Sequence, residues 1–387
     1  MTQKILVLIW LVFFATRLYV FRFPPPNYSD VFHDYRRYAS MWASGITPYF
    51  KHLYEYPPAT LPVLYFPEWL NRQNIGHYYE NYRLQILIFD LILFYFIIRK
   101  VRELKIKPLS KYLALSFYIS GTTIAKDFLY EGLDLLFFGT LALALIFYSR
   151  RLLFWILFWL TVSLKLLTAP LVVPYFFLNR KPFFQELKTA VLGFLVVWGL
   201  PLIIFRTSLL VMFFFHGVRG LKYASFPGFV VETINYFTQT ETRLNQPPDF
   251  QLQGPVADIV TKITAIIFPL SIGLVLIYAL VKIIKKHSLD YYTFGLKLAL
   301  IYIFTIFITA KIFSQPFHIW FIPLIALFPF KSLKQQLSMM GFALLLLIVD
   351  TTPWIRYQAD YKFYAYLFLR YIPMFTLLGL SYKLPEK

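Results

Sequence analysis

The 387-residue chain contains no cysteine, so it can form neither disulfide bonds nor thiolate metal sites. Charged residues are also scarce, at 15% of the chain against about 25% in soluble proteins. Acidic side chains are the rarer kind, with 19 Asp and Glu against 38 Lys and Arg. Hydrophobic residues reach 59%, above the roughly 45–50% that is usual in water-soluble domains. The composition therefore excludes an ordinary soluble globular protein and indicates a membrane protein.

A formal net charge of +19 would raise the question of nucleic-acid binding in a soluble protein. Here the basic residues lie in short clusters between apolar runs, as in residues 99–111. That distribution is typical of cytoplasmic loops between membrane helices. We therefore expect membrane lipids, and no nucleic acid, as partners. The first apolar run, residues 5–21, has no small-residue cleavage site and predicts a retained span rather than a signal peptide.

Membrane helices need about 20 apolar residues, with a working range of roughly 17–25. Apolar runs, some of them short, lie at about residues 4–21, 84–98, 111–125, 132–149, 187–205, 263–283, 294–310, 317–330, 336–350 and 363–382. A further run, residues 152–178, is interrupted by Lys165 and flanked by basic residues. Splitting it at Lys165 into two short helices keeps both flanking clusters cytoplasmic. We expect an all-α, multi-pass bundle of about twelve crossings with both termini cytoplasmic, forming one domain over residues 1–387.

This topology places the main polar signals on the extracytoplasmic face. The first outer loop carries Asp30, Asp34 and Glu55. Carboxylates there are candidates for a general base or for metal ligands, because a positioned carboxylate can remove a hydroxyl proton while a bond forms. The alternative is that they are solvated loop charges paired with Arg36 and Arg37.

Several ionisable residues lie within or beside the apolar runs. Lys165 is at a depth where an ionisable group usually faces a cavity or a partner, and its ammonium could reach a phosphate. The alternative for Lys165 is snorkelling to the outer interface. We expect Asp90 to be hydrogen-bonded internally and Arg17 to snorkel. Glu131 and Asp134 lie at the start of a helix on the predicted outer side. They could belong to a site, or they could interact favourably with the helix dipole.

Two later outer segments carry further candidates. His216, Arg219 and Lys222 are close together in the sequence and suit an anionic group such as a phosphorylated lipid head. Their alternative is a general attraction to anionic lipid. In the loop that begins at Lys311, Gln315 and His318 could bind sugar hydroxyls.

Short motifs occur in order along these outer segments. The first loop contains DYRRYA (34–39), GITPY (45–49) and EYPP (55–58). Downstream follow SLK (163–165) with Pro170, FHGVRGLKYAS (215–225) and KIFSQPFHIWFIPL (311–324). Together these motifs resemble GT-C membrane glycosyltransferases, most closely glycosyltransferase family 87 and more loosely the first mannosyltransferase of GPI-anchor synthesis.

The resemblance implies transfer of a sugar, often mannose, from a polyprenyl-phosphate donor to an acceptor hydroxyl of a glycolipid or glycan. The reaction would occur with inversion on the extracytoplasmic side of the cell membrane. The resemblance assigns roles as follows: Asp34, or else Asp30, as the base; Lys165, His216 and Arg219 at the donor phosphate; Glu55, Tyr56, Gln315 and His318 at the sugar or acceptor. A divalent metal at Asp30 and Asp34 is left open.

Two other functions are considered. A transporter or flippase of a lipid-linked saccharide would also need intramembrane charge and outer loops, but such proteins often show paired halves with matching broken helices. No such pairing is evident in the sequence. A catalytically inactive membrane assembly protein could keep the same fold.

Overall fold

The computed structural model describes residues 3–23, 29–178, 182–246, 249–285, 289–351 and 361–386. These residues are mainly helical, which confirms the predicted all-α class apart from one small β-sheet. The chain forms two compact units, described separately below. Unit 1 comprises Met1–Val218 and Ile322–Pro329, and unit 2 comprises Arg219–Phe321 and Phe330–Lys387. A single working domain over the whole chain stays a prediction.

Among the described residues, five helical segments are long and apolar enough to cross a membrane. They are Gln3–Arg22, Phe183–Phe214, Pro255–Lys285, Tyr291–Thr309 and Leu333–Thr351. Apolar side chains on three of them face outward, for example Leu11 (61% exposed), Val196 (65%) and Leu270 (61%). Exposed apolar surface of this extent suits contact with lipid tails. The membrane character is therefore supported, while the count of about twelve crossings stays a prediction.

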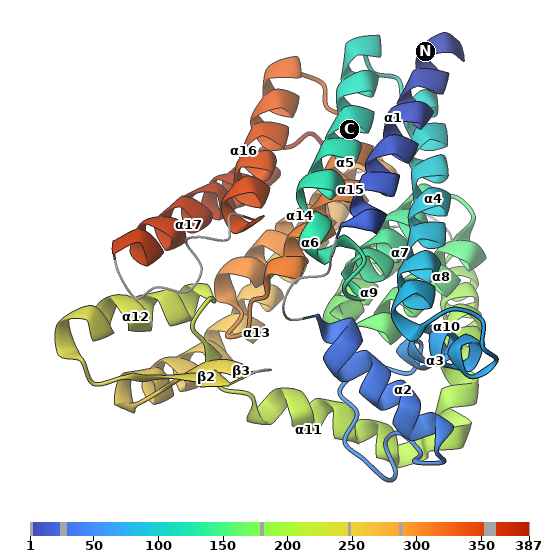
Figure 1. Ribbon diagram of the computed structural model, residues 1–387. Coiled ribbons are helices and arrows are strands. Elements are labelled where there is room, and N and C mark those ends of the chain that lie inside the picture. Colours follow the sequence, from blue (N-terminus) through green and yellow to red (C-terminus); the bar gives the residue numbers. More distant parts are fainter. Residues whose placement is uncertain are drawn as a thin grey trace. The chain divides into compact units, whose positions relative to one another are not determined.

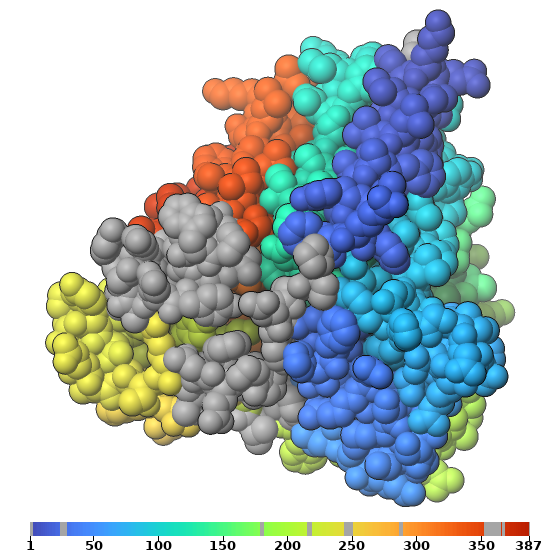
Figure 2. Space-filling view, viewed as in Figure 1, coloured from blue at the N-terminus to red at the C-terminus, as the bar shows by residue number. Residues whose placement is uncertain are grey.

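Unit 1 is built from α-helices with three short π- or 3₁₀-helical turns (η) between them. Its elements are α1 (Gln3–Arg22), η1 (Val31–Tyr35), α2 (Arg36–Ala43), α3 (Thr60–Arg72), α4 (Tyr78–Glu103), α5 (Pro108–Ile124), α6 (Lys126–Leu129), α7 (Asp134–Ile146), α8 (Arg151–Leu164), η2 (Leu166–Leu171), α9 (Val172–Phe177), α10 (Phe183–Phe205), η3 (Arg206–Leu210) and α11 (Val211–Val218). Helix α4 packs against α3, α5 and α7, and α1 packs against α5 (Figure 1). Helix α2 lies on the surface of this unit (Figure 2).

Helix α8 packs between α7 and α10. Its contact with α10 is close, because a Cβ at Gly193 would lie only 2.8 Å from the Cβ of Trp155. Helix α8 ends at Leu164, and Lys165 is extended, with φ −157° and ψ 117°. Two short segments, η2 and α9, follow in place of one long helix. The predicted break at Lys165 is thus confirmed.

Unit 2 combines long helices with the sheet. Its elements are β1 (Leu221–Lys222), α12 (Phe226–Thr238), β2 (Thr242–Gln246), β3 (Asp249–Gln253), α13 (Pro255–Lys285), α14 (Tyr291–Thr309), η4 (Gln315–Trp320), α16 (Leu333–Thr351) and α17 (Tyr361–Tyr382); α15 (Phe321–Leu327) belongs mostly to unit 1. Helix α14 packs against α13 and α17, and its residues from Thr293 to Ile308 are buried. Helix α14 is therefore the core helix of unit 2.

The sheet has the order β1-β3-β2, with both pairs antiparallel. Leu221 of β1 lies opposite Leu252 of β3, and both pack with Val231 and Ala257 in a small core. Helix α12 and strand β3 lie against α13 (Figure 1). This sheet was not predicted from the sequence, because its strands are too short and too polar to stand out as apolar runs.

Candidate functional site

The segment of unit 1 that contains Asp30 and Asp34 folds as η1 followed directly by α2. Asp30 stands immediately before η1, Asp34 lies within it, and Glu55 lies in the loop that leads to α3. All three carboxylates are half-buried. The aromatic side chains between them are packed edge to face, with the ring centroids of Tyr35 and Tyr56 5.8 Å apart. The loop is therefore an ordered layer of tyrosines with carboxylates at its margins.

Electrostatics show which carboxylates adjoin Tyr35 and Tyr56. Burial raises the pKa of Tyr35, and the neighbouring Tyr56, Asp30 and Asp134 raise it further. Burial also raises the pKa of Tyr56, with Glu55 and Asp30 adding to the effect. The Asp30 carboxylate is therefore close to both phenols, and Asp134, at the start of α7, is close to Tyr35.

Tyr38 is close to the carboxylates of Asp34 and Glu55. Burial raises the pKa of Tyr38 to about 12, and Glu55 and Asp34 contribute to the rise. Asp34 also accepts a hydrogen bond from Arg37 Nη2 at 3.1 Å, and the Arg37 side chain is 60% exposed. The alternative expectation, that Asp34 pairs with a loop arginine, is confirmed, and the partner is Arg37.

Lys165 joins this region from the break after α8. Its Nζ donates to Asp134 Oδ1 at 3.3 Å, with the lysine side chain 30% exposed. The neighbouring backbone is tied to the loop that follows EYPP, because the Ala59 amide donates to the carbonyl of Ser163 at 3.0 Å and to its Oγ at 3.1 Å. Lys165 therefore has a carboxylate partner beside Tyr35. Of the two interpretations of Lys165, a partner and snorkelling, the structure shows a partner.

Glu55 and Tyr56 lie in the same loop, so unit 1 contains five of the predicted site residues in one region: Asp30, Asp34, Glu55, Tyr56 and Lys165. His216 falls in α11, and its side chain lies outside the described residues.

The remaining predicted residues are in unit 2, where three cationic residues meet. The Lys222 amide donates to the Lys311 carbonyl at 3.0 Å, and Lys222 Nζ donates to Ser314 Oγ at 3.0 Å. Lys311 Nζ donates to the carbonyl of Arg219. Burial lowers the pKa of Lys311, and the positive charge of Arg219 lowers it further. We call Arg219, Lys222, Lys311 and Ser314 the cationic cluster; Lys311 was not among the predicted site residues.

His318 is buried in η4, at 2% exposure. Its Nδ1 lies 2.8 Å from the Gln315 carbonyl oxygen, and its Nε2 lies 2.7 Å from Asp350 Oδ2. The imidazole therefore lies between a carbonyl oxygen and a carboxylate. Asp350 also pairs with Arg370 Nε at 2.9 Å. Contacts of Gln315 and His318 with sugar stay predictions, and each would have to coexist with these internal contacts.

Sequence reasoning missed Asp350 and Arg370. Asp350 ends the apolar run of α16, and Arg370 interrupts the run of α17. An ionisable residue at such a position usually has an internal partner, and that signal could have identified both.

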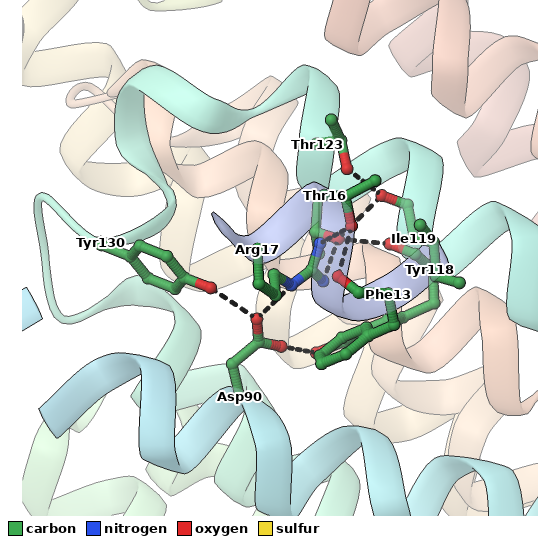
Figure 3. Close-up of polar contacts among 9 residues, drawn as sticks. Phe13, Thr16, Arg17, Asp90, Tyr118, Ile119, Thr123 and Tyr130 are labelled. Carbon is green, nitrogen blue, oxygen red and sulfur yellow. Dashed lines mark hydrogen bonds and ion pairs between the residues drawn. The ribbon is translucent and has the colours of Figure 1, made fainter. Parts of the chain in front are cut away.

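A second buried network lies inside unit 1 (Figure 3). Arg17 Nε donates to Asp90 Oδ2 at 2.6 Å, and its Nη2 donates to Thr122 Oγ1 at 2.6 Å. Tyr118 and Tyr130 donate their hydroxyls to Asp90 at 2.7 and 2.9 Å. The internal role expected for Asp90 is confirmed. The expectation that Arg17 snorkels is wrong, since Arg17 is only 2% exposed and the Asp90 carboxylate is within reach.

Across the described ranges, no group of three His, Asp or Glu side chains is arranged to hold a metal ion. Comparison with protein-family models finds no match, and no curated protein matches the chain. The resemblance to GT-C glycosyltransferases therefore depends on the sequence motifs alone.

Proposed function

We propose that the protein is a GT-C-type glycosyltransferase of the cell membrane. It transfers a sugar, mannose by the motif resemblance, from a polyprenyl-phosphate donor to a glycolipid or glycan hydroxyl on the extracytoplasmic side. Two findings support the proposal: the apolar helices, and the grouping of Asp30, Asp34 and Glu55 with the Lys165–Asp134 pair around buried tyrosines. The grouping is the observation that carries it.

The proposed reaction is a displacement at the anomeric carbon. An Asp carboxylate of the first loop takes the proton of the acceptor hydroxyl as that oxygen bonds to the anomeric carbon. The bond from this carbon to the phosphate oxygen breaks, and the electron pair leaves with the polyprenyl phosphate. The transition state resembles an oxocarbenium ion, so negative charge develops on the departing phosphate.

Lys165 is the residue of unit 1 that suits this developing charge. Its ammonium is partly exposed and pairs with Asp134. Lys165 itself lies at the break that follows α8. A preformed positive charge in a partly dry site stabilises an anionic leaving group more than the same charge does in water. No step of this mechanism requires a metal ion.

Unit 2 carries a second arrangement that suits phosphate. Arg219 supplies a planar fork of donors, and Lys222 and Lys311 supply point charges. Ser314, which accepts from Lys222, adds a neutral hydroxyl to the cluster. We assign the cationic cluster to recognition of an anionic lipid headgroup, the chemistry that the polyprenyl-phosphate donor provides.

The test is transfer of labelled mannose from polyprenyl-phosphate mannose to endogenous lipid in membranes. The wild type is compared with Asp30→Asn and Asp34→Asn, and with the control Asp127→Asn. Asp127 is a carboxylate of α6 that pairs with Lys126 and is not among the predicted site residues. We expect transfer to disappear in one of the first two variants and to persist in the control. Equal transfer in all four proteins would contradict an aspartate base in this loop.

A further inference from the structure

A buried carboxylate outside the proposed reacting group connects several parts of unit 1. Glu131, 7% exposed, accepts hydrogen bonds from Ser29 Oγ at 2.6 Å and from the Tyr79 hydroxyl at 2.5 Å. Its Oε1 also lies 3.2 Å from Arg83 Nε. The carboxylate therefore joins α4 to the residue that precedes Asp30. The dipole at the start of α7 does not explain this set of partners.

Arg83 extends the connection to the end of α1. Its Nη1 donates to the carbonyl of Phe21 and its Nη2 to that of Val20, each at 2.8 Å. Arg83 is itself only 5% exposed. One buried ion pair thus fixes both the last turn of α1 and the start of η1. We call Ser29, Tyr79, Arg83 and Glu131 the Glu131 network.

Ser29 transmits this restraint to Asp30. Its Oγ accepts from the Val31 amide at 3.2 Å, and its carbonyl accepts from the Phe32 and His33 amides, each at 3.1 Å. Tyr79, held by Glu131, stacks on Phe32 with ring centroids 4.3 Å apart. Asp30 lies between two residues that the network holds, so the network fixes the backbone on both sides of its side chain.

Asp34 is held in a different way. Its described partner is Arg37, three residues further along the same helical turn, and that arginine is mostly exposed. Exposed pairs of this kind place a side chain weakly, because water and salt screen them. The restraint on the Asp30 backbone is therefore buried, whereas the Arg37–Asp34 pair lies at the surface.

We propose that Glu131, together with Arg83, is a positioning residue that sets Asp30 against the acceptor hydroxyl, and that Asp30 rather than Asp34 is the general base. The inference depends on the proposed sugar transfer. Precise placement matters because a small misplacement of a reacting group costs as much as a hundredfold in rate. Neither Glu131 nor Ser29 needs to touch the substrate.

The experiment measures kcat and KM for transfer from polyprenyl-phosphate mannose, normalised to folded protein. Asp30→Asn should lower kcat by about a hundredfold or more, the usual contribution of a general base. Asp34→Asn should stay within about threefold, since a screened surface pair contributes little. Ser29→Ala should lower kcat by about tenfold with KM nearly unchanged, because it loosens Asp30 without altering donor contacts.

Matched variants separate positioning from general loss of structure. Ser29→Thr keeps the hydroxyl and should restore most of the kcat that Ser29→Ala loses. Ser120→Ala removes a hydroxyl that bonds only within α5, and should behave as the wild type. Glu131→Gln should lower kcat at least as much as Ser29→Ala does. If the Glu131→Gln protein does not fold, the Ser29 variants alone test the positioning role.

The outcomes distinguish this inference from the proposed function. A folded wild type that transfers no sugar would overturn the proposed function itself. An active wild type with an inactive Asp30→Asn, but with unchanged kcat in Ser29→Ala, would overturn the positioning role alone. An inactive Asp34→Asn beside an active Asp30→Asn would overturn the choice of base. A Ser29→Thr protein as impaired as Ser29→Ala would show that the hydroxyl is not what matters.

Discussion

The candidate site regions of the two units hold charge of opposite sign. In unit 1, half-buried carboxylates surround a layer of tyrosines, and Lys165 and Arg37 each pair with one of them. In unit 2, the ammonium groups of Lys222 and Lys311 donate to neutral oxygens of Ser314 and Arg219. Carboxylates among buried phenols suit proton transfer, whereas cations brought together suit an anionic ligand. Changes in unit 1 should therefore affect kcat, and changes in unit 2 should affect donor binding.

A similar contrast holds within unit 1 between buried and exposed ion pairs. The Arg17–Asp90 pair is at most 2% exposed and is completed by four hydroxyl groups, whereas Arg37 of the Asp34 pair is 60% exposed. Burial makes removal of one partner costly, because the remaining charge is left without compensation. The first pair therefore supports the fold, while the second lies at the surface of unit 1.

The largest expected effect comes from breaking the buried pair. Asp90→Asn should lower the free energy of unfolding by about 3–5 kcal/mol, because it leaves the Arg17 charge uncompensated. Asp34→Asn should cost about 1 kcal/mol or less. Chemical unfolding of the detergent-solubilised proteins measures both. Equal losses for the two variants would contradict the contrast between them.

The next effect concerns Lys165. Lys165→Met should lower kcat about a hundredfold, as is typical when one group that stabilises transition-state charge is removed. Lys165→Arg, which keeps the charge, should recover part of the rate. Lys111→Met is the control, since Lys111 lies in the basic cluster of residues 99–111 and donates to the Arg102 carbonyl. A Lys165→Met protein that changes only KM would argue against a role at the leaving phosphate.

A smaller effect is expected in unit 2. Lys311→Met should raise KM for the donor by about tenfold and leave kcat nearly unchanged, because one charged hydrogen bond to a bound anion is lost. In the wild type, donor affinity should fall as the pH rises through the pKa of Lys311, which lies below the usual 10.5. High salt should weaken donor binding in the same direction. A pure kcat effect would contradict the assignment of the cationic cluster.

The smallest effect appears only in alkali. The folded protein holds the Tyr38 proton until about pH 12, whereas the unfolded chain releases it near the ordinary pKa of 10.0. The unfolded state therefore binds fewer protons between these values, and the stability of the wild type should fall as the pH rises through this window. In Tyr38→Phe, the loss of stability that comes from ionisation of Tyr38 should be absent. Below about pH 9, the stability of the two proteins should depend on pH in the same way. Thermal unfolding across the pH range tests it.

The sequence was sufficient for features that depend on neighbouring residues. Apolar runs indicated membrane helices, and the basic residues around residues 152–178 located the break at Lys165. Asp90 was expected to have an internal partner because a charge in mid-span needs one. These features are local, or follow from the energetic cost of an ionised group in an apolar environment.

The partners themselves could not be predicted, because they are far apart in the chain. Arg17 bonds to Asp90, and Ser29 bonds to Glu131, across separations that no spacing rule covers. Asp350 is likewise far in sequence from its partners His318 and Arg370. The sheet was missed for a different reason, since its strands are short and mostly polar.

Sugar transfer is measured most directly with purified protein in lipid vesicles that contain labelled polyprenyl-phosphate mannose and a membrane lipid acceptor. We predict that labelled glycolipid and free polyprenyl phosphate appear in equal amounts, and that both are lost in Asp30→Asn. The opposite result would be donor that moves between the leaflets with its glycosidic bond intact and yields no labelled product. That outcome would contradict a glycosyltransferase and favour a flippase of lipid-linked saccharides.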